Sequence, residues 1–384
     1  MPEGMKILLF SASYGDGHLQ ACHALEQAFK IENRNNQVWL IDFMHMIHPR
    51  LNKVTRSMYL YSIRTTPTLY RQFYKSTNSE SLNKTMVRVG RSKTLQVLRD
   101  LQPDAIISTF PHPSGVLSRL RGKGSLQIPY ATVVTDYVLH RQWIHPHTDH
   151  YFVASDGLAQ QLMKEGIKAD RITASGIPVR AAFSQPLERE SLYQKYALQP
   201  DRPVLLVLTG AFGVLPDVLP LCKMLAEMDI PLQLLVVCGR NRELFSTLQH
   251  SLTRTANPVR LFGYVEPIHE LMTLSDLVIT KAGGLTVSEC LALGKPMLLH
   301  RVIPGQEEGN AHFLLQQGAA VTTDNLAQIH QQLRHLLTSS EALNTLQVNA
   351  RRISKPHAAQ EVVTKIRSWK NAESERTQRL SLKS

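Results

Sequence analysis

The sequence has few cysteines and no long apolar segment. Its 384 residues include four cysteines, which are far apart and form no CxxC pair. We expect them to be small buried side chains of a protein from a reducing compartment. No apolar run reaches the ~20 residues that a membrane-spanning helix needs, and the first residues lack the layout of a signal peptide. The sequence therefore predicts a cytoplasmic protein that does not cross a membrane.

Several motifs with well-defined chemistry are also missing. The histidines form no HExxH pattern, and no D-x-D motif of the kind that holds a nucleotide-bound divalent ion is present. We therefore predict no metal site and no tightly bound cofactor. Gly15 and Gly17 follow a predicted strand, but no third glycine comes at the spacing of a dinucleotide fingerprint.

Acidic residues are scarce in one segment of this basic protein. The formal net charge is +12, and residues 44–99 contain eleven Lys or Arg against one acid, Glu80. Aromatic side chains are interleaved with these cations. This pattern suits an anionic membrane surface, where each cation adds roughly 1 kcal/mol. RNA or single-stranded DNA and a solvated basic helix face are the alternatives. We favour anionic membrane lipids and predict no nucleic-acid partner.

The predicted strands are continuous apolar runs separated by helical patterns, which is typical of parallel sheets covered by helices on both faces. The first series is residues 7–10, 38–41, 105–107, 131–134, 151–154 and 172–174. The second is residues 204–208, 232–238, 259–262, 277–279, 297–300 and 320–322. This alternation predicts an α/β fold of two doubly wound, Rossmann-like halves. Ligands of such sheets bind beyond the strands' carboxyl ends, so we expect the two halves to face across a binding cleft.

A charged stretch with several prolines predicts the boundary between the halves. We expect the following segments: an N-terminal domain over residues 1–180, a linker over 181–203, a C-terminal domain over 204–352, a helix over 353–370 that packs back on the N-terminal domain, and a flexible tail over 371–384.

Residues 276–310 carry the most specific ligand signal. An apolar run ends at Gly283 and Gly284, and a helix is expected to open at Thr286 with Glu289 one turn inside. Bare glycine backbone and the free amides of a helix N-terminus favour phosphate. The Glu289 carboxylate can accept two hydroxyl hydrogen bonds from a ribose. A Gly-Gly turn alone would indicate only a tight turn, but the order of features predicts a nucleotide.

Polar residues extend this signal. Gln306, Glu307 and Asn310 are expected in a loop after the next buried strand, which suits a ligand rich in hydroxyl groups. Together with the anion site they predict a nucleotide-sugar. Glycine turns after two further strands, at Gly210 and Gly263, would allow a ligand to approach the backbone closely, although either could be plain turn chemistry.

A second candidate site follows the first strand. His18 comes after a glycine turn and is expected to begin or cap the next helix. An imidazole of near-neutral pKa there could remove a proton from an alcohol, whereas a histidine that only bonds its own loop is the alternative. Asp136 follows another strand. It could orient a histidine, contact acceptor hydroxyls, or simply cap a helix.

Taken together, these motifs resemble glycosyltransferase family 28. More narrowly, they resemble the bacterial processive diacylglycerol β-glucosyltransferases and the plant monogalactosyldiacylglycerol synthases. The resemblance is carried by residues 13–18, 135–140, 176–178, the loop at 210 and residues 281–310, and it runs from about residue 6 to residue 366. It implies a two-domain GT-B fold, UDP-glucose as the donor and diacylglycerol as the acceptor. It also implies a cytoplasmic enzyme that is peripheral on the inner face of the cell membrane.

The resemblance implies a role for each matched residue. His18 would be the general base, with Asp136 as a second catalytic residue. The donor-binding residues would be Gly210, Phe212, Gly263, Tyr264, Gly283, Gly284, Leu285, Thr286, Glu289, Gln306, Glu307 and Asn310. The acceptor- and membrane-contacting residues would be Tyr14, Gly17, Arg56, Tyr59, Arg64, Tyr70, Arg71, Phe73 and Lys75.

The implied reaction is an inverting transfer of glucose to the 3-hydroxyl of 1,2-diacylglycerol, repeated if the enzyme is processive. A UDP-galactose-dependent diacylglycerol galactosyltransferase and a GlcNAc transferase acting on a polyprenyl-linked peptidoglycan intermediate are the alternatives. Glucose and galactose differ in the orientation of one hydroxyl, and no residue in the sequence distinguishes them. The number of sugars added and the oligomeric state are equally open.

Overall fold

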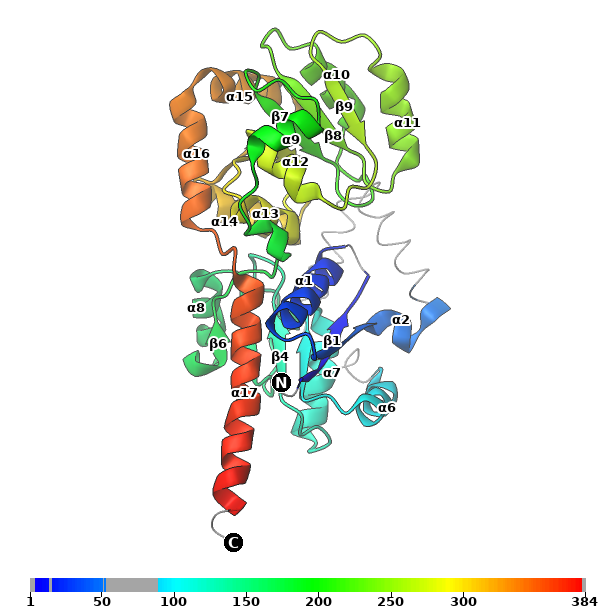
Figure 1. Cartoon of the computed structure of the whole chain (residues 1–384), viewed down its shortest axis with the longest axis vertical. Helices are drawn as coiled ribbons and strands as arrows, with labels where there is room; N and C mark the ends of the chain where they lie inside the picture. Colours follow the sequence, from blue (N-terminus) through cyan, green and yellow to red (C-terminus); the bar gives the residue numbers. More distant parts are fainter. Residues whose placement is uncertain (1–3, 14–15, 51, 53–88, 382–384) are drawn as a thin grey trace. The chain divides into compact units, whose positions relative to one another are not determined.

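The computed structural model describes residues 4–13, 16–50, 52 and 89–381, and it contains two compact α/β units (Figure 1). The first unit comprises the described residues up to 181 together with the chain from residue 357, and the second comprises residues 182–356. Each unit has one six-stranded sheet in which all pairings are parallel. The predicted pair of doubly wound halves is confirmed.

In both sheets the first strand along the chain is an interior strand, and later strands are added on both sides of it. The strand orders are β2-β1-β3-β4-β5-β6 and β12-β11-β10-β7-β8-β9. The first sheet contains β1 (Lys6–Ser11), β2 (Gln37–Asp42), β3 (Ala105–Ser108), β4 (Tyr130–Val133), β5 (His150–Phe152) and β6 (Ile172–Thr173). The second contains β7 (Val204–Leu208), β8 (Gln233–Val237), β9 (Val259–Phe262), β10 (Leu277–Thr280), β11 (Met297–His300) and β12 (Ala320–Thr323). Every predicted strand is confirmed.

Helices connect the strands. Those of the first unit are α1 (Gly17–Glu32), α2 (Phe43–Ile47), α6 (Arg91–Leu101), α7 (Pro111–Gly122), α8 (Asp156–Lys164) and α17 (Ala358–Ser381), with short 3-10 helices η1 (Arg141–Trp143) and η2 (Ala169–Arg171). A further 3-10 helix, η3 (Ala181–Phe183), follows. Those of the second unit are α9 (Arg189–Lys195), α10 (Val218–Ala226), α11 (Arg242–Ser251), α12 (Ile268–Leu274), α13 (Gly284–Ala292), α14 (Gln306–Gln316), α15 (Leu326–Thr338) and α16 (Ser340–Arg352).

Strand β1 shows why continuous apolar runs mark a sheet with two covered faces. Ile7 and Leu9 point to one face and belong to a core cluster with side chains of α1 and α17. Leu8 and Phe10 point to the other face and pack with side chains of α2, α6 and α7. All four are fully buried, because successive side chains of a strand alternate between faces that are both covered here.

The last helix, α17, packs in the first unit. Val362 and Ile366 are buried in the same cluster as α1, beside which α17 runs in Figure 1. The Lys370 ammonium donates to the Gly4 carbonyl at 3.1 Å and lies 3.6 Å from the Asp104 carboxylate. Helix α17 continues to Ser381, through most of the segment expected to be a flexible tail. That stretch contains neither glycine nor proline, so no residue in it breaks a helix.

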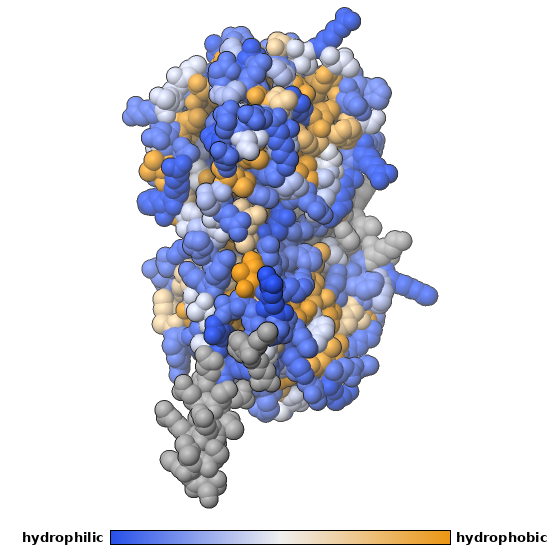
Figure 2. Space-filling model, viewed as in Figure 1, coloured by the Kyte–Doolittle hydropathy of each residue, from blue (hydrophilic) through white to orange (hydrophobic). Residues whose placement is uncertain are grey.

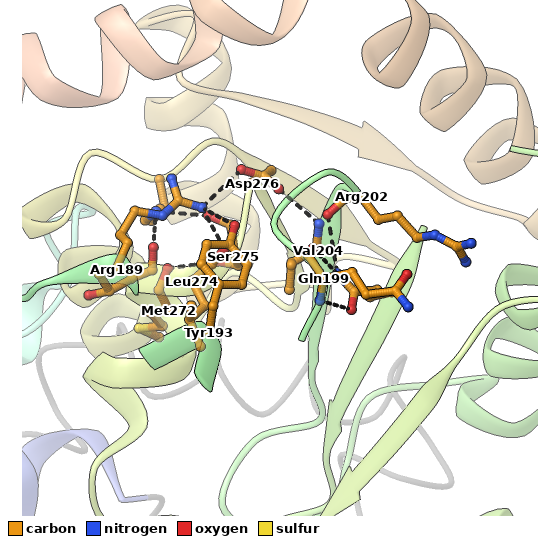
Figure 3. Close-up of polar contacts among 12 residues, drawn as sticks. Arg189, Tyr193, Gln199, Arg202, Val204, Met272, Leu274, Ser275 and Asp276 are labelled. Atoms are coloured by element: carbon orange, nitrogen blue, oxygen red, sulfur yellow. Dashed lines mark hydrogen bonds and ion pairs between the residues drawn. The ribbon is translucent and has the colours of Figure 1, made fainter. Parts of the chain in front are cut away.

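The segment expected to be a linker is partly helical. Helix α9 packs on α12, and the Arg189 guanidinium donates to the Leu274 carbonyl at 2.9 Å (Figure 3). The same figure shows Asp276, whose Oδ2 accepts a hydrogen bond from the Val204 amide at 2.8 Å. These bonds join α9 and the starts of β7 and β10, so residues 189–204 are part of the second unit.

Hydrophilic residues dominate the described surface on the face that Figure 2 shows. In Figure 2, hydrophilic residues cover most of the described surface, and hydrophobic residues form smaller groups among them.

Over the described part of the chain, no helix combines the length and the apolarity needed to cross a membrane. All four cysteines are buried and free, as predicted.

Candidate functional site

The candidate donor site lies at the carboxyl end of the second sheet, where its winding changes direction. Strands β7 and β10 are neighbours, but the chain runs from β7 outward on one side and from β10 outward on the other. The helices that leave two such strands diverge, which opens the usual ligand position of doubly wound sheets. The Gly210 turn follows β7 and the Gly283 turn follows β10.

The turn after β10 presents a helix N-terminus. Gly283 is the N-cap of α13, with φ −72° and ψ 130°, and the helix begins at Gly284, two residues earlier than expected. The next two residues, Leu285 and Thr286, are therefore in its first turn, where backbone amides have no partner within the helix and attract anions. Glu289 is the sixth residue of the helix and is only 9% exposed.

The prediction of a polar loop after β11 is wrong. Gln306, Glu307 and Asn310 lie in the first two turns of α14, which begins directly at Gln306 after Gly305. Acids in the first turn of a helix are favoured by its dipole, so the same polar sequence is a helix start. Asn310 is fully buried, and its amide donates to the Ala282 carbonyl at 2.9 Å. Asn310 therefore fixes the turn that carries Gly283.

Sequence reasoning did not single out Lys281, which lies among these residues. Its ammonium group forms an ion pair with the Glu307 carboxylate. A Cβ atom added at Gly210 would meet the Lys281 Cε atom at 3.4 Å, and one added at Gly283 would meet Nζ at 3.6 Å. The lysine thus lies against both glycine turns. Its position immediately after a strand at the change of winding was the available signal.

Three loops on the β7 side bring aromatic and cationic groups together. The Arg240 guanidinium lies 5.7 Å from the Phe212 ring centre and 4.4 Å from that of Tyr264. These residues follow β7, β8 and β9, the last beside Gly263, and the Tyr264 side chain is 47% exposed. Rings and guanidinium planes offer stacking surfaces to a flat base. Arg240 was not predicted; its signal was its place in the loop after β8.

The second candidate site lies at the corresponding point of the first sheet, between β1 and β3. His18 is the second residue of α1, whose N-cap is Asp16. The His18 Nδ1 atom lies 2.7 Å from the Thr135 Oγ1 atom, in the loop after β4. The Thr109 hydroxyl, just after β3, donates to the His18 carbonyl at 2.9 Å. The edge of the imidazole also packs against the Phe110 ring, with centres 5.1 Å apart. The ring is therefore contacted by residues that follow β3 and β4, and the His18 backbone is held by Thr109.

This environment keeps the imidazole neutral. Burial lowers the pKa of His18 to about 4, against a smaller opposing effect of the Thr109 backbone. A neutral imidazole has one N–H donor and one lone pair. In the tautomer protonated at Nδ1, the ring donates to the Thr135 hydroxyl and its Nε2 lone pair can accept a proton.

The remaining predicted residues of the first unit divide into described and undescribed positions. Asp136 lies in a bend directly after Thr135 and is 4% exposed. It caps no helix, since the N-cap of the nearby η1 is His140. Gly17 is the first residue of α1. The other predicted acceptor and membrane contacts lie outside the described residues: Tyr14, Arg56, Tyr59, Arg64, Tyr70, Arg71, Phe73 and Lys75. Within the described ranges, no three His, Cys, Asp or Glu side chains are grouped to hold a metal ion.

Two family models cover most of the chain. Residues 18–179 match the model described as monogalactosyldiacylglycerol (MGDG) synthase, and residues 204–362 match the glycosyltransferase family 28 C-terminal domain. A processive diacylglycerol beta-glucosyltransferase of Bacillus licheniformis is 33% identical over 370 residues, which is 95% of this chain and 95% of that protein. The Bacillus cytotoxicus protein of the same name is 35% identical over 367 residues, covering 94% of this chain and 93% of that protein.

The chain belongs to glycosyltransferase family 28. It is an enzyme that transfers a sugar, and the predicted family is confirmed. Solved structures agree on the fold. MurG of Acinetobacter baumannii has a TM-score of 0.60 at 17% identity, covering 96% of this chain and 100% of that one. A UDP-GlcNAc 2-epimerase from Neisseria meningitidis has a TM-score of 0.60 at 16% identity, covering 94% and 99%. The predicted GT-B fold is thereby confirmed.

Proposed function

We propose that this protein transfers glucose from UDP-glucose to the 3-hydroxyl of 1,2-diacylglycerol, with inversion at the anomeric carbon. Relatives named for this acceptor and sugar match nearly the whole chain. The observation that carries the proposal is the neutral His18 imidazole, held by Thr135 at the change of winding of the first sheet. An alcohol acceptor needs a group with a free lone pair to take its proton as it attacks, and a neutral imidazole has one. With a pKa of about 4, His18 is a weaker base than the near-neutral histidine expected from the sequence.

His18 acts as the general base in this proposal. The acceptor oxygen attacks the anomeric carbon from the face opposite UDP, and its proton passes to the Nε2 atom of His18. The bond to the departing UDP breaks in the same displacement, which inverts the configuration. Thr135 is the positioning residue, since its hydroxyl accepts the Nδ1 proton and fixes the ring. Asp136, buried next to it, is proposed to act in the same site.

The second unit is proposed to bind the donor. The first-turn amides of α13, at Gly284 to Thr286, and the Lys281 ammonium stabilise the charge that develops on the leaving diphosphate. Glu289 accepts hydrogen bonds from the ribose, and the backbone at Gly263 with the Tyr264 ring receives the uracil. The first turn of α14, with Gln306 and Glu307, is proposed to receive the hexose.

The cationic groups of the second unit remove the need for a metal in this proposal. Helix amides and Lys281 supply the positive charge that a divalent ion provides in other transferases. We accordingly propose turnover without a bound metal or cofactor. The enzyme is proposed to work on the inner face of the cell membrane, with residues 44–99 attracted by anionic lipids and without a nucleic-acid partner.

Product analysis tests the proposal. The protein is incubated with diacylglycerol in anionic vesicles and either UDP-glucose or UDP-galactose. The lipids are then separated, their masses are determined by mass spectrometry and the anomeric configuration by NMR. We expect a β-linked hexosyl-diacylglycerol from UDP-glucose, with EDTA leaving the rate unchanged. A parallel incubation contains UDP-GlcNAc and a polyprenyl-linked acceptor instead. Product only in that incubation, or only from UDP-galactose, would contradict the proposed substrates.

A base variant separates chemistry from binding. His18→Ala is expected to abolish turnover while leaving the affinity for UDP-glucose, measured by calorimetry, close to that of the unchanged protein. Retention of most of kcat in this variant would refute the role of His18.

A further inference from the structure

A partly buried ion pair lies at the change of winding of the second sheet. Lys281 comes directly after β10, and Glu307 is the second residue of α14. Their side chains are only 21% and 13% exposed, and the ammonium and carboxylate groups are in contact. Desolvating two charges to this extent often costs as much as their attraction returns. Stability alone is therefore a weak reason for the pair.

The lysine lies where an anion is expected to bind. Gly210 and Gly283 have no side chain to keep the Lys281 methylene and ammonium groups away from the two turns. The ammonium group is thus beside the first amides of α13, which attract phosphate oxygens. An anion bound to those amides comes within reach of Lys281. In the unliganded protein the only charge that Lys281 is seen to contact, among the described residues, is Glu307.

The glutamate has an oxygen that the pair does not use. Oε1 contacts Lys281, whereas Oε2 is buried and lacks a hydrogen-bond partner among the described residues. A buried carboxylate oxygen without a donor is unfavourable. Sugar hydroxyls are suitable donors, and Gln306 of the same helical turn lies in the part of the site proposed to receive the hexose.

We propose that Lys281 exchanges partners when the donor binds. Its ammonium group passes from Glu307 to the diphosphate, and both carboxylate oxygens of Glu307 then accept hydrogen bonds from hexose hydroxyls. This inference rests on the proposed UDP-sugar function. It adds that Glu307 competes with the nucleotide for the Lys281 cation. Glu307 gains hydrogen-bond donors in place of that cation only when a sugar is attached to the nucleotide.

The exchange also accounts for product release. Once the hexose has moved to the acceptor, Glu307 loses its hydroxyl donors while UDP remains. The freed carboxylate then attracts Lys281 back and is repelled by the phosphates, so UDP dissociates. The pair therefore favours UDP-hexose over UDP, although UDP carries the greater negative charge.

Calorimetric titration of the full chain with UDP, UDP-glucose and uridine tests the exchange. In Glu307→Gln, Lys281 has no competing carboxylate, and we expect UDP to bind roughly fivefold more tightly. UDP-glucose loses its charged acceptor, so the preference for UDP-glucose over UDP falls. In Lys281→Met, we expect UDP binding to weaken roughly tenfold or more, with uridine binding unchanged.

A matched variant controls for loss of charge alone. Glu308→Gln removes one negative charge from the same helical turn, where Glu308 contacts the Gly305 amide at 3.3 Å, and it is expected to leave both affinities unchanged. Equal or weaker UDP binding by Glu307→Gln would overturn the exchange while leaving the proposed function intact. Absence of UDP binding by the unsubstituted protein would overturn both. Glu307→Gln is nearly isosteric but leaves the partly buried Lys281 cation without its counter-charge, so a lower thermal midpoint is expected and the titrations are run well below it.

Discussion

The Oγ1 atom of Thr135 lies 2.7 Å from the Nδ1 atom of His18, although the two residues are 117 positions apart in the sequence. The contact joins the loop after β4 to the start of α1. In the tautomer protonated at Nδ1, Nε2 is the imidazole nitrogen that can accept a proton. Thr135 therefore has a direct part in orienting the proposed base.

Replacing the Thr135 hydroxyl should impair catalysis without affecting the donor. We expect Thr135→Val to lower kcat roughly tenfold to a hundredfold, since the ring loses the partner that fixes its tautomer and orientation. The KM for UDP-glucose should stay the same. Thr135→Ser, which restores the hydroxyl, should recover most of kcat. Equal losses in the valine and serine variants would contradict this role, because only the serine variant keeps the hydroxyl that contacts His18.

Two buried histidines should make the protein sensitive to acid. Burial lowers the pKa values of His145 and His150 to about 4, with Lys365 and Arg171 adding to the effect at His150. The unfolded chain, with an ordinary value of 6.5, therefore binds more protons between pH 4 and 6.5. The contribution of these two histidines to the free energy of unfolding is fully present above pH 6.5 and is lost as the pH falls towards 4.

Each histidine contributes up to about 1.4 kcal/mol per pH unit over this range. Urea unfolding at pH 7.5, 6.5 and 5.5 measures the slope. His150→Gln should reduce it, because glutamine does not titrate and retains a group that can bond the Thr173 hydroxyl, which is 2.8 Å from the His150 ring. His147→Gln, at an exposed side chain, is measured beside it as a control for the change of His to Gln.

Gly239 should tolerate no side chain. Its φ is +61°, and an added Cβ would lie 2.5 Å from the Gly210 carbonyl oxygen and 2.6 Å from that of Ala211. Gly239→Ala must therefore displace the backbone after β7, and we expect weaker UDP binding together with a lower free energy of unfolding. Gly124→Ala is the matched control, since φ is +69° and nothing lies within 4 Å. It should cost only about 1–2 kcal/mol of conformational strain and leave UDP affinity unchanged.

Asp276 should be needed for the stability of the second unit. Its Oδ2 accepts from the Val204 amide, and its Oδ1 lies 3.4 Å from the Arg189 guanidinium (Figure 3). Asp276→Ala removes the acceptor of a partly buried amide and should lower the free energy of unfolding by about 1–3 kcal/mol. Asp276→Asn keeps an acceptor oxygen and should lower the free energy of unfolding by less. Asp229→Ala, which breaks an exposed pair with Arg334, should shift the thermal midpoint little.

The same arrangement occurs in the first unit, where Asp104 precedes β3. Its Oδ2 accepts from the Lys6 amide at 2.8 Å, and the cation beside it is Lys370 of α17. An aspartate in front of the strand that borders the first strand of the sheet thus recurs in both halves. Aspartate is common in turns, so an aspartate in front of a strand does not reveal which amide it will bond.

The sequence by itself determined the two sheets and the location of the donor loops. Continuous apolar runs separated by helical patterns are sufficient to predict parallel strands, and glycine turns at strand ends are local features of the chain. It also placed His18 at the mouth of the first sheet and identified the family.

Only the tertiary structure decided which residues meet. The Thr135–His18 contact, the Lys281–Glu307 pair and the Arg240 stack each join segments separated by at least 24 residues, and no local pattern encodes such pairing. The first turn of α14 was predicted as a loop for a related reason. Polar residues are compatible with a loop and with a helix start, and packing of α14 on the sheet stabilises the helix.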